Sequence, residues 1–306
     1  MTDRIGQQLG NYQLVQLLGE GSFAAVYLGG HVHLGTLAAI KVLHAQLTSE
    51  DIGTFRTEAR VIAHLLHPNI VRVLDFGIEE TTPFLVMDFA PHGTLRQHYP
   101  RGTQLPLHAV VSNITAVADA LQYAHEERLI HRDVKPENML VGRRKEILLS
   151  DFGIAMLAQS SSDRRSSDTA GTMVYMAPEQ IQGKPCPASD QYSLGIVAYE
   201  WLCGACPFVG SSAIEVAMKH MSERPRPLRD VLPSIAPAAE QVVLRALAKN
   251  PEERFVNIRD FASALEQASS SDHANVVSQT SLQSGYLPSV GTPTTAASDD
   301  SFPTLP

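Results

Sequence analysis

The sequence is poor in cysteine and lacks long apolar runs, and each shortage excludes a class of protein. Its three cysteines are too few, and odd in number, for a disulfide framework, which favours a reducing, cytoplasmic environment. Cys203 and Cys206 have the spacing of a metal-binding pair, but no second cysteine pair or histidine cluster completes a zinc site. The longest apolar stretch, around residues 194–203, is too short to span a bilayer, and residues 1–8 are polar. We therefore expect neither a membrane segment nor a signal peptide.

Basic residues are also in the minority. The 24 lysines and arginines face 32 aspartates and glutamates, a formal net charge of −8, which argues against nucleic acid as a partner. Hydrophobic residues make up 44% and charged residues 18% of the chain, a balance typical of a soluble folded protein. After residue 267 serine, threonine, proline and small residues dominate and lysine and arginine are absent. We predict that residues 268–306 form a disordered tail.

Two short apolar segments near the middle of the chain predict a β-hairpin. They comprise residues 139–141 and 147–149, on either side of a polar turn. Asp133 and Asn138 precede the first segment, and Asp151 follows the second. Because the open ends of a hairpin lie together, we expect these three side chains to be close in space. Carboxylate and amide oxygens are the ligands that hard divalent cations such as Mg²⁺ prefer.

Two tripeptides in this region carry a resemblance to a known family. His131-Arg132-Asp133 and Asp151-Phe152-Gly153, with Lys135 and Asn138 between them, resemble the catalytic and metal loops of the eukaryotic-like protein kinases. Either tripeptide alone would fit an ordinary loop-capping aspartate. The resemblance implies an α+β, bilobal kinase fold, with a β-rich N-lobe containing one main helix and a mainly helical C-lobe. The phrase at 131–138, HRDVKPEN, resembles the bacterial serine/threonine members most.

The N-terminal part contains a glycine turn between two predicted strands, residues 12–18 and 24–29. Gly19 and Gly21 in this turn allow backbone amides to approach phosphate oxygens closely. Because a strand rather than a helix follows, a phosphate-covering hairpin fits better than a dinucleotide-binding turn. Ala24 stands in place of the third glycine of the kinase pattern.

Lys41 lies in a third predicted strand, residues 37–43, and the resemblance implies that it holds the α- and β-phosphates of ATP. An apolar stripe predicts a helix over residues 49–66, and Glu58 flanks that stripe. We expect Glu58 to point inward and to form an ion pair with Lys41. Such a pair would orient the lysine rather than add much stability, because buried pairs roughly cancel their desolvation cost.

Further nucleotide contacts are implied by the resemblance alone. Strands are predicted at 70–76 and 83–87, followed by a hinge at 88–91 whose backbone would bind adenine. Four apolar side chains would enclose the purine and a fifth, Met87, would be the gatekeeper. The full set implied to bind ATP is Leu18, Gly19, Gly21, Val26, Ala39, Lys41, Glu58, Met87, Asp88, Ala90, Leu140 and Asp151.

The predicted domain boundaries follow from these assignments. Residues 1–11 form an N-terminal segment and residues 12–267 the kinase domain. Within that domain the N-lobe spans 12–87, the hinge 88–91 and the C-lobe 92–267, which opens with an amphipathic helix at 107–126.

The resemblance also assigns chemical tasks. Asp133 would accept the proton of the substrate hydroxyl, Lys135 would meet charge on the γ-phosphoryl group, and Asn138 with Asp151 would hold Mg²⁺, or Mn²⁺ as an alternative. Lys135, two residues after the aspartate, resembles serine/threonine kinases. We therefore expect an ATP-dependent phosphotransferase that acts in signalling on protein substrates, including itself, with a homodimer suited to trans-autophosphorylation.

Residues 151–179 would form the activation segment, ending in Ala177-Pro178-Glu179. Its middle is rich in serine, and Ser166, Ser167 and Thr169 are the phosphorylation candidates, with Arg132 as the expected phosphate partner. Asp190 is expected to cap a buried helix over 190–202 and to tie down the catalytic loop, and Arg254 is expected to pair with Glu179.

Two alternatives to an active protein kinase remain open. A pseudokinase acting as a scaffold or allosteric partner usually lacks the strand lysine, the catalytic aspartate or the metal aspartate, whereas Lys41, Asp133 and Asp151 are all present here. A small-molecule phosphotransferase could share the bilobal fold. The Ala-Pro-Glu segment with its substrate platform, and Gly171-Thr172 ahead of it, argue against this second alternative.

Overall fold

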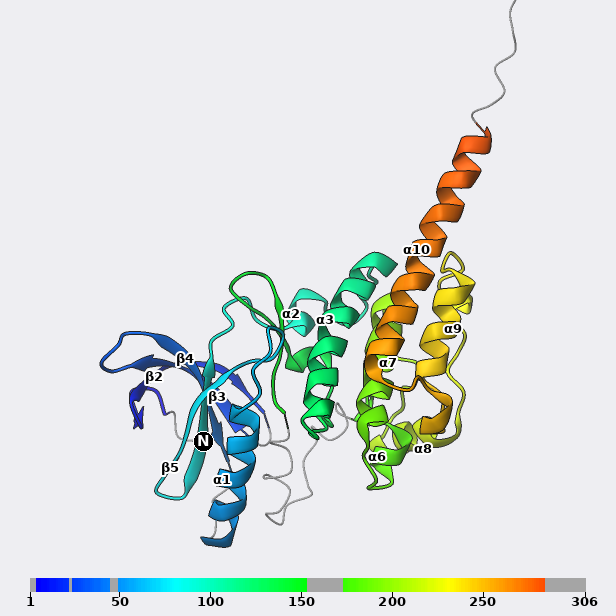
Figure 1. Ribbon diagram of the computed structural model, residues 1–306. Coiled ribbons are helices and arrows are strands. Elements are labelled where there is room, and N and C mark those ends of the chain that lie inside the picture. The colour runs from blue at the N-terminus through cyan, green and yellow to red at the C-terminus, as the bar shows by residue number, and fades with distance from the viewer. Residues whose placement is uncertain (1–3, 22–23, 45–48, 153–172, 284–306) are drawn as a thin grey trace, which may run out of the picture. The chain divides into compact units, whose positions relative to one another are not determined.

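A six-stranded antiparallel sheet forms the N-terminal part of the chain. We analysed a computed structural model that describes residues 4–21, 24–44, 49–152 and 173–283. The strand order is β1-β2-β3-β4-β6-β5 (Figure 1). The strands are β1 (Gln8–Leu9), β2 (Tyr12–Glu20), β3 (Ala24–His31), β4 (Leu37–Leu43), β5 (Val73–Glu79) and β6 (Thr82–Asp88). Strand β1 was not expected from the sequence. It adds an edge strand to the sheet, in which Gln8 pairs with Gln13 of β2.

Helix α1 (Ser49–Ala63) lies beside β5 and buries Phe55, Ala59 and Ile62 (Figure 1). It ends three residues before the predicted boundary, and the side chain of Leu66 is 63% exposed rather than part of the buried stripe. The last turn tightens instead of continuing, because the Leu65 amide donates to the Ile62 carbonyl at 3.1 Å, three residues back.

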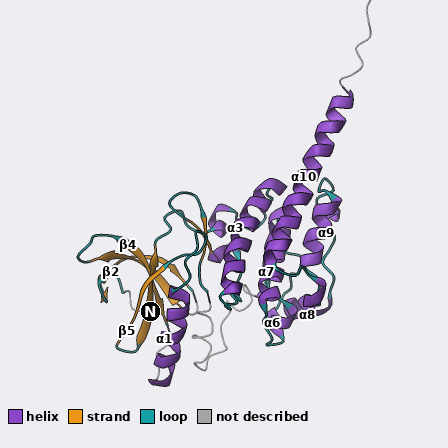
Figure 2. Ribbon diagram, in the orientation of Figure 1, coloured by secondary structure: helices purple, strands orange, loops and turns teal. Residues whose placement is uncertain are grey.

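The C-terminal part is mainly helical, and its only strands among the described residues form one short hairpin (Figure 2). The hairpin and the helix at 107–126 have the predicted boundaries. The elements are α2 (Leu95–His98), α3 (Leu107–Glu126), η1 (Pro136–Asn138), β7 (Met139–Val141), β8 (Ile147–Leu149), α6 (Pro178–Ile181), α7 (Pro187–Cys203), α8 (Ala213–Ser222), η2 (Leu228–Asp230), α9 (Pro237–Ala246), η3 (Pro251–Glu253) and α10 (Ile258–Gln283).

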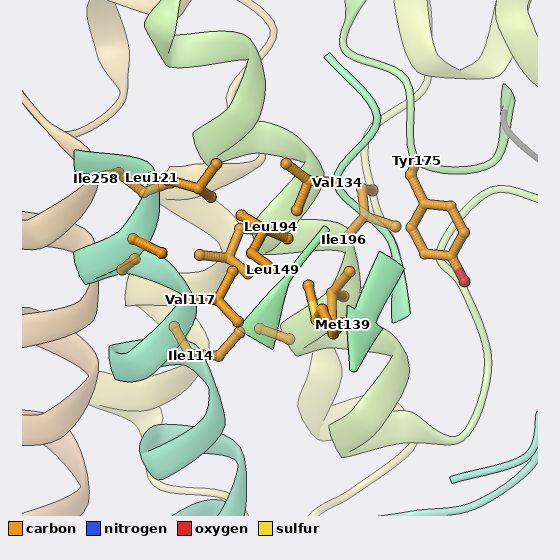
Figure 3. Packing of buried hydrophobic residues seen from close by; sticks show 14 of the residues in the cluster. Ile114, Val117, Leu121, Val134, Met139, Leu149, Tyr175, Leu194, Ile196 and Ile258 are labelled. Carbon is orange, nitrogen blue, oxygen red and sulfur yellow. The ribbon is translucent and has the colours of Figure 1, made fainter. Parts of the chain in front are cut away.

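Helix α7 is the central support of this part. Every residue from Ser189 to Cys203 is buried, as its apolar composition on all sides predicts. Figure 3 shows Leu194 of α7 near Val117 of α3 and Leu149 of the hairpin. Helix α9 packs closely against another side of α7. If residue 195 carried a Cβ in place of glycine, that atom would lie 3.1 Å from the Ala246 side chain. The hairpin that carries the polar residues therefore rests on a rigid apolar base.

The predicted tail begins differently from the expectation. The chain divides into two compact units, residues 1–269 and 270–306, and α10 continues to Gln283. The predicted disorder is therefore wrong for residues 268–283, which are helical. Residues 284–306 lie outside the described part. Extending an existing helix costs no new nucleation, so a polar sequence without proline can follow an amphipathic one. Among the described residues, no helix has the length and apolar composition needed to cross a membrane.

Candidate active site

The loop before the hairpin brings Asp133, Lys135 and Asn138 together. The side-chain nitrogen of Asn138 donates to the backbone carbonyl of Asp133 at 2.7 Å and to the side-chain Oδ2 of Asp133 at 2.9 Å. The Lys135 ammonium lies 2.9 Å from the same Oδ2. Oδ1 of Asp133 is buried without a hydrogen-bond partner among the described residues. One carboxylate oxygen of Asp133 is thus fixed by two donors, while the other accepts no hydrogen bond from the described residues.

Asn138 and Asp151 flank the open end of the hairpin, as expected. Met139 pairs with Leu149, and the Ser150 amide donates to the Asn138 carbonyl at 2.9 Å. Both hydrogen bonds from the Asn138 side chain to Asp133 use its nitrogen, so its Oδ1 remains suited to a metal. Among the described residues no group of three His, Cys, Asp or Glu side chains could hold a metal.

Lys41 reaches this end of the hairpin from the sheet. In the sheet register Lys41 lies opposite Val26 of β3, and its ammonium is 2.8 Å from Oδ1 of Asp151. Burial by itself would raise the pKa of the Asp151 carboxyl, but the neighbouring Lys41 charge holds that pKa below its ordinary value. Asp151 is therefore a carboxylate at neutral pH. Its backbone has a φ of 68°, a conformation that non-glycine residues seldom adopt.

The predicted ion pair between Lys41 and Glu58 is wrong for this structure, because Lys41 is paired with Asp151. Oε2 of Glu58 is buried and has no hydrogen-bond partner among the described residues. Burial raises the pKa of the Glu58 carboxyl, and the charge of Arg132 acts in the opposite direction. Glu58 points inward as expected, but the helix does not bring its carboxylate to the lysine.

The catalytic-loop backbone is anchored to α7 by Asp190. Its carboxylate accepts hydrogen bonds from the amides of His131 at 2.9 Å and Arg132 at 2.8 Å, and lies 2.7 Å from the His125 ring nitrogen. The predicted tie is confirmed. Asp190 does not cap the helix, because α7 begins earlier, with Cys186 at the N-cap. These two bonds hold Arg132 at a φ of 67°, a strained value that needs such support.

The remaining residues assigned to the nucleotide come from both parts of the chain. Gly19 pairs with Val26, and Ala39 pairs with Met87. Leu140 lies in β7, and one isolated bridge joins that strand to Thr94. The other members occupy the end of β2, the following turn and the end of β6 with its linker, and are Leu18, Gly21, Asp88 and Ala90. Ser166, Ser167 and Thr169 lie outside the described residues.

A polar cluster around Arg96 of α2 was not expected from the sequence. The guanidinium donates to Glu137 Oε1 at 2.9 Å and to both Glu200 oxygens at 2.8 and 3.0 Å, and it also donates to the Tyr175 hydroxyl. The Tyr175 hydroxyl in turn donates to Glu200 at 2.7 Å. Arg96 thereby links the catalytic loop to α7 and to the end of the activation segment. The one sequence signal that pointed to this cluster is Glu137, an acidic residue four positions after Asp133.

The expected pair between Glu179 and Arg254 is confirmed. Both terminal nitrogens of Arg254 lie 2.8 Å from the two Glu179 oxygens, in a bidentate arrangement. Ser189 donates to the same carboxylate at 2.7 Å. This buried pair fixes the end of the activation segment to the C-terminal part of the domain.

Comparison with known proteins gives consistent matches. The protein kinase domain family model matches residues 12–268. Serine/threonine-protein kinase Pkn1 of Myxococcus xanthus is 40% identical over 272 residues, or 86% of this chain and 39% of that protein. Serine/threonine-protein kinase PrkC of Bacillus subtilis is 32% identical over 275 residues, covering 89% and 42%. Serine/threonine-protein kinase PknA of Mycobacterium tuberculosis is 38% identical over 274 residues, covering 87% and 63%. The chain spans about two fifths of the length of the first relatives it matches.

Proposed function

The chain belongs to the protein kinase family, among relatives named as bacterial serine/threonine kinases, and we propose that it phosphorylates serine and threonine hydroxyls of proteins with ATP. The observation that carries the proposal is the set of side chains gathered at the open end of the hairpin. Lys41 with Asp151, and Lys135 with Asn138 around Asp133, supply the charges that phosphoryl transfer needs. The relatives' names give no support to a pseudokinase.

Each residue has a step that its contacts suit. Asp133 would accept the substrate hydroxyl proton on Oδ1, because Oδ2 is held by Lys135 and Asn138. Lys135 would lie beside the transferred phosphoryl group. Lys41 would contact the α- and β-phosphates, and Asn138 Oδ1 with the Asp151 carboxylate would hold Mg²⁺ or Mn²⁺. A bound cation there would neutralise charge on the phosphates.

The apolar nucleotide residues would complete the site. Ala39 and Met87 are adjacent across β4 and β6, so one surface of the sheet would contact the purine. Val26, Leu18 and Leu140 would enclose it, with hydrogen bonds from the backbone of residues 88–90. The cytoplasm is the proposed compartment, and proteins, including a second copy of this chain, are the proposed substrates.

We expect the purified protein to transfer phosphate from radiolabelled ATP to itself or to dephosphorylated casein in the presence of Mg²⁺, and to lose this activity when EDTA is added. Lys41→Met should abolish transfer, because it removes the cation proposed to hold the phosphates. Lys184→Met, which changes an exposed lysine of the C-terminal part, controls for the substitution itself. Circular dichroism checks that both variants are folded. Full transfer by Lys41→Met would contradict the role given to Lys41.

We also propose that phosphorylation of Ser166, Ser167 or Thr169 raises activity. Replacing all three by alanine should lower autoactivated transfer several-fold, because it removes the phosphate proposed to pair with Arg132. The measurement compares wild type and variant after preincubation with ATP, with mass-spectrometric mapping of the phosphates. A triple variant that transfers phosphate at the wild-type rate from the start of the reaction would contradict the proposal.

A further inference from the structure

A cavity of about 560 Å³ lies where three segments of the chain meet: the loop after α1, the linker after β6 and the turn of the β7–β8 hairpin. Its size is within the range of pockets that bind ligands. Of the described residues assigned above to the nucleotide or to catalysis, only Asp88 is among those that line it. The cavity is therefore separate from the site of the proposed chemistry.

Backbone hydrogen bonds hold the walls of this cavity in place. The Val71 amide donates to the Leu149 carbonyl at 2.9 Å, and the Leu149 amide donates to the Asn69 carbonyl at 2.8 Å. These bonds join the loop after α1 to the hairpin. The Asp88 amide donates to the Arg72 carbonyl at 3.0 Å, which joins the linker to the same loop. The cavity is thus pre-formed, and a ligand would bind without rearranging the backbone.

Three arginines give the cavity its chemical character. Arg72 comes from the loop after α1, Arg143 and Arg144 come from the hairpin turn, and all three are exposed. Across the described ranges, no hydrogen bond or ion pair engages their guanidinium groups. Of the two carboxylates that line the same cavity, that of Glu146 accepts the backbone amide of Arg144 at 2.7 Å, and only Asp88 is left to oppose the arginines. Since guanidinium groups match carboxylates in shape and charge, the cavity favours an anionic ligand.

Apolar side chains form much of the remaining lining. Leu66 is 63% exposed and Leu37 is 45% exposed, and Phe89 of the linker is partly buried. Apolar surface gathered in a cavity, rather than scattered singly, is typical of a binding site. A small anion would satisfy the arginines but leave this surface in contact with water. A peptide that carries both carboxylates and apolar side chains would cover both parts of the lining.

We propose that this cavity is a docking site for an acidic segment of a protein substrate. Its carboxylates would bind Arg72, Arg143 and Arg144, as in other acidic motifs recognised by arginine clusters. Its apolar side chains would contact Leu37 and Leu66. The inference rests on the proposed kinase function, because a segment docked here would tether the substrate and raise the concentration of its hydroxyl groups at the active site.

The direct test measures binding of a fluorescein-labelled peptide of alternating aspartate and leucine by fluorescence anisotropy. Combining Arg143→Gln with Arg144→Gln should raise the Kd about 10-fold, because two charged donors are lost while the backbone bond to Glu146 remains. Lys145→Gln is the matched control: it removes a charge from the same turn, but Lys145 does not line the cavity. Its Kd should stay within about twofold of wild type, since solvent and salt screen a charge outside the contact. Leu66→Asn should raise the Kd about 3-fold through lost apolar contact.

The same peptide with asparagine in place of aspartate should bind about 10-fold more weakly to the wild type, because it lacks the carboxylates. Equal binding of the two peptides, or an unchanged Kd in the double variant, would overturn the proposal. Arg72→Gln provides a second measurement if circular dichroism shows that the double variant does not fold. Sedimentation velocity tests the other occupant: a dimer of the wild type that the double variant abolishes would assign the cavity to a second copy of the chain and also overturn the proposal.

Steady-state kinetics with dephosphorylated casein, an acidic protein, separate this inference from the proposed function. The double variant should raise the KM for casein about 3- to 10-fold, while kcat and the KM for ATP stay within about twofold of wild type. A wild type that binds the acidic peptide through these arginines but transfers no phosphate would contradict the proposed function and leave the binding site standing. A wild type that transfers phosphate but does not bind the peptide would contradict the docking site alone.

Discussion

Replacing Asp133 by asparagine is expected to lower the turnover number by about 10²–10⁴-fold, the usual contribution of a positioned acid or base. The substitution keeps the shape of the side chain but removes its ability to take a proton. Oδ1 of Asp133 is the buried oxygen without a partner among the described residues, and Oδ2 is already bound by Lys135 and Asn138. The effect should therefore appear in the chemical step, measured as kcat with saturating ATP and casein.

The affinity for ATP should change little in Asp133→Asn, and isothermal titration with a non-hydrolysable ATP analogue measures it. The reason is that Lys41, proposed to hold the phosphates, and Asp151, proposed to hold the metal, are paired with each other and not with Asp133. Asp230→Asn, at an exposed carboxylate in η2, is the matched control and should behave as wild type. A large loss of nucleotide binding in Asp133→Asn would assign this carboxylate to the nucleotide instead of the proton.

The elements that sequence reasoning placed best are those bounded by clear turns. Strand β4, helix α3 and the β7–β8 hairpin begin and end at the predicted residues. Each of these elements has an apolar pattern that matches either the helical or the strand period. Polar or proline-containing segments interrupt the pattern at both ends. The polar residues next to the hairpin follow from its geometry, so the proximity of Asp133 and Asn138 was predictable.

Partners that meet across packed elements were not predictable in the same way. The sequence places Glu58 beside a buried stripe, but whether Lys41 reaches Glu58 or Asp151 depends on how α1 is seated against the sheet. Arg96 lies on a four-residue helix, and its partner Glu200 is 104 residues away along the chain. Such clusters have no periodic signature, because their members come from separate elements with unrelated patterns.

Arg254→Leu is expected to lower the free energy of unfolding by about 3–5 kcal/mol, since breaking a buried ion pair leaves one charge without compensation. The Arg254 side chain is 0% exposed and also donates to the carbonyls of Ala188 and Ala248 at 2.7 and 2.9 Å. Leucine fills part of the space but satisfies neither these carbonyls nor Glu179. Urea unfolding monitored by the fluorescence of Trp201 measures the change.

Arg259→Leu provides the matched control. This arginine also pairs with a carboxylate, that of Asp119 at 2.6 Å, but its side chain is 53% exposed. Exposed pairs contribute about 0–1 kcal/mol, so the control should lose little stability. A similar loss in the two variants would mean that burial of the Glu179 pair is not the source of the effect.

The pH dependence of unfolding gives an independent test of the same pair. Burial would raise the pKa of Glu179, but hydrogen bonds from Arg254 and Ser189 hold it below its ordinary value of 4.5. A carboxyl group with a depressed pKa stabilises the fold above its unfolded pKa, and this contribution is lost as the pH falls through the folded value. Wild type should therefore lose stability below pH 4.5. In Arg254→Leu the arginine no longer opposes the effect of burial, so the pKa of Glu179 rises. The variant should therefore lose less stability than wild type below pH 4.5. The difference in the free energy of unfolding between the two proteins should narrow as the solution is acidified.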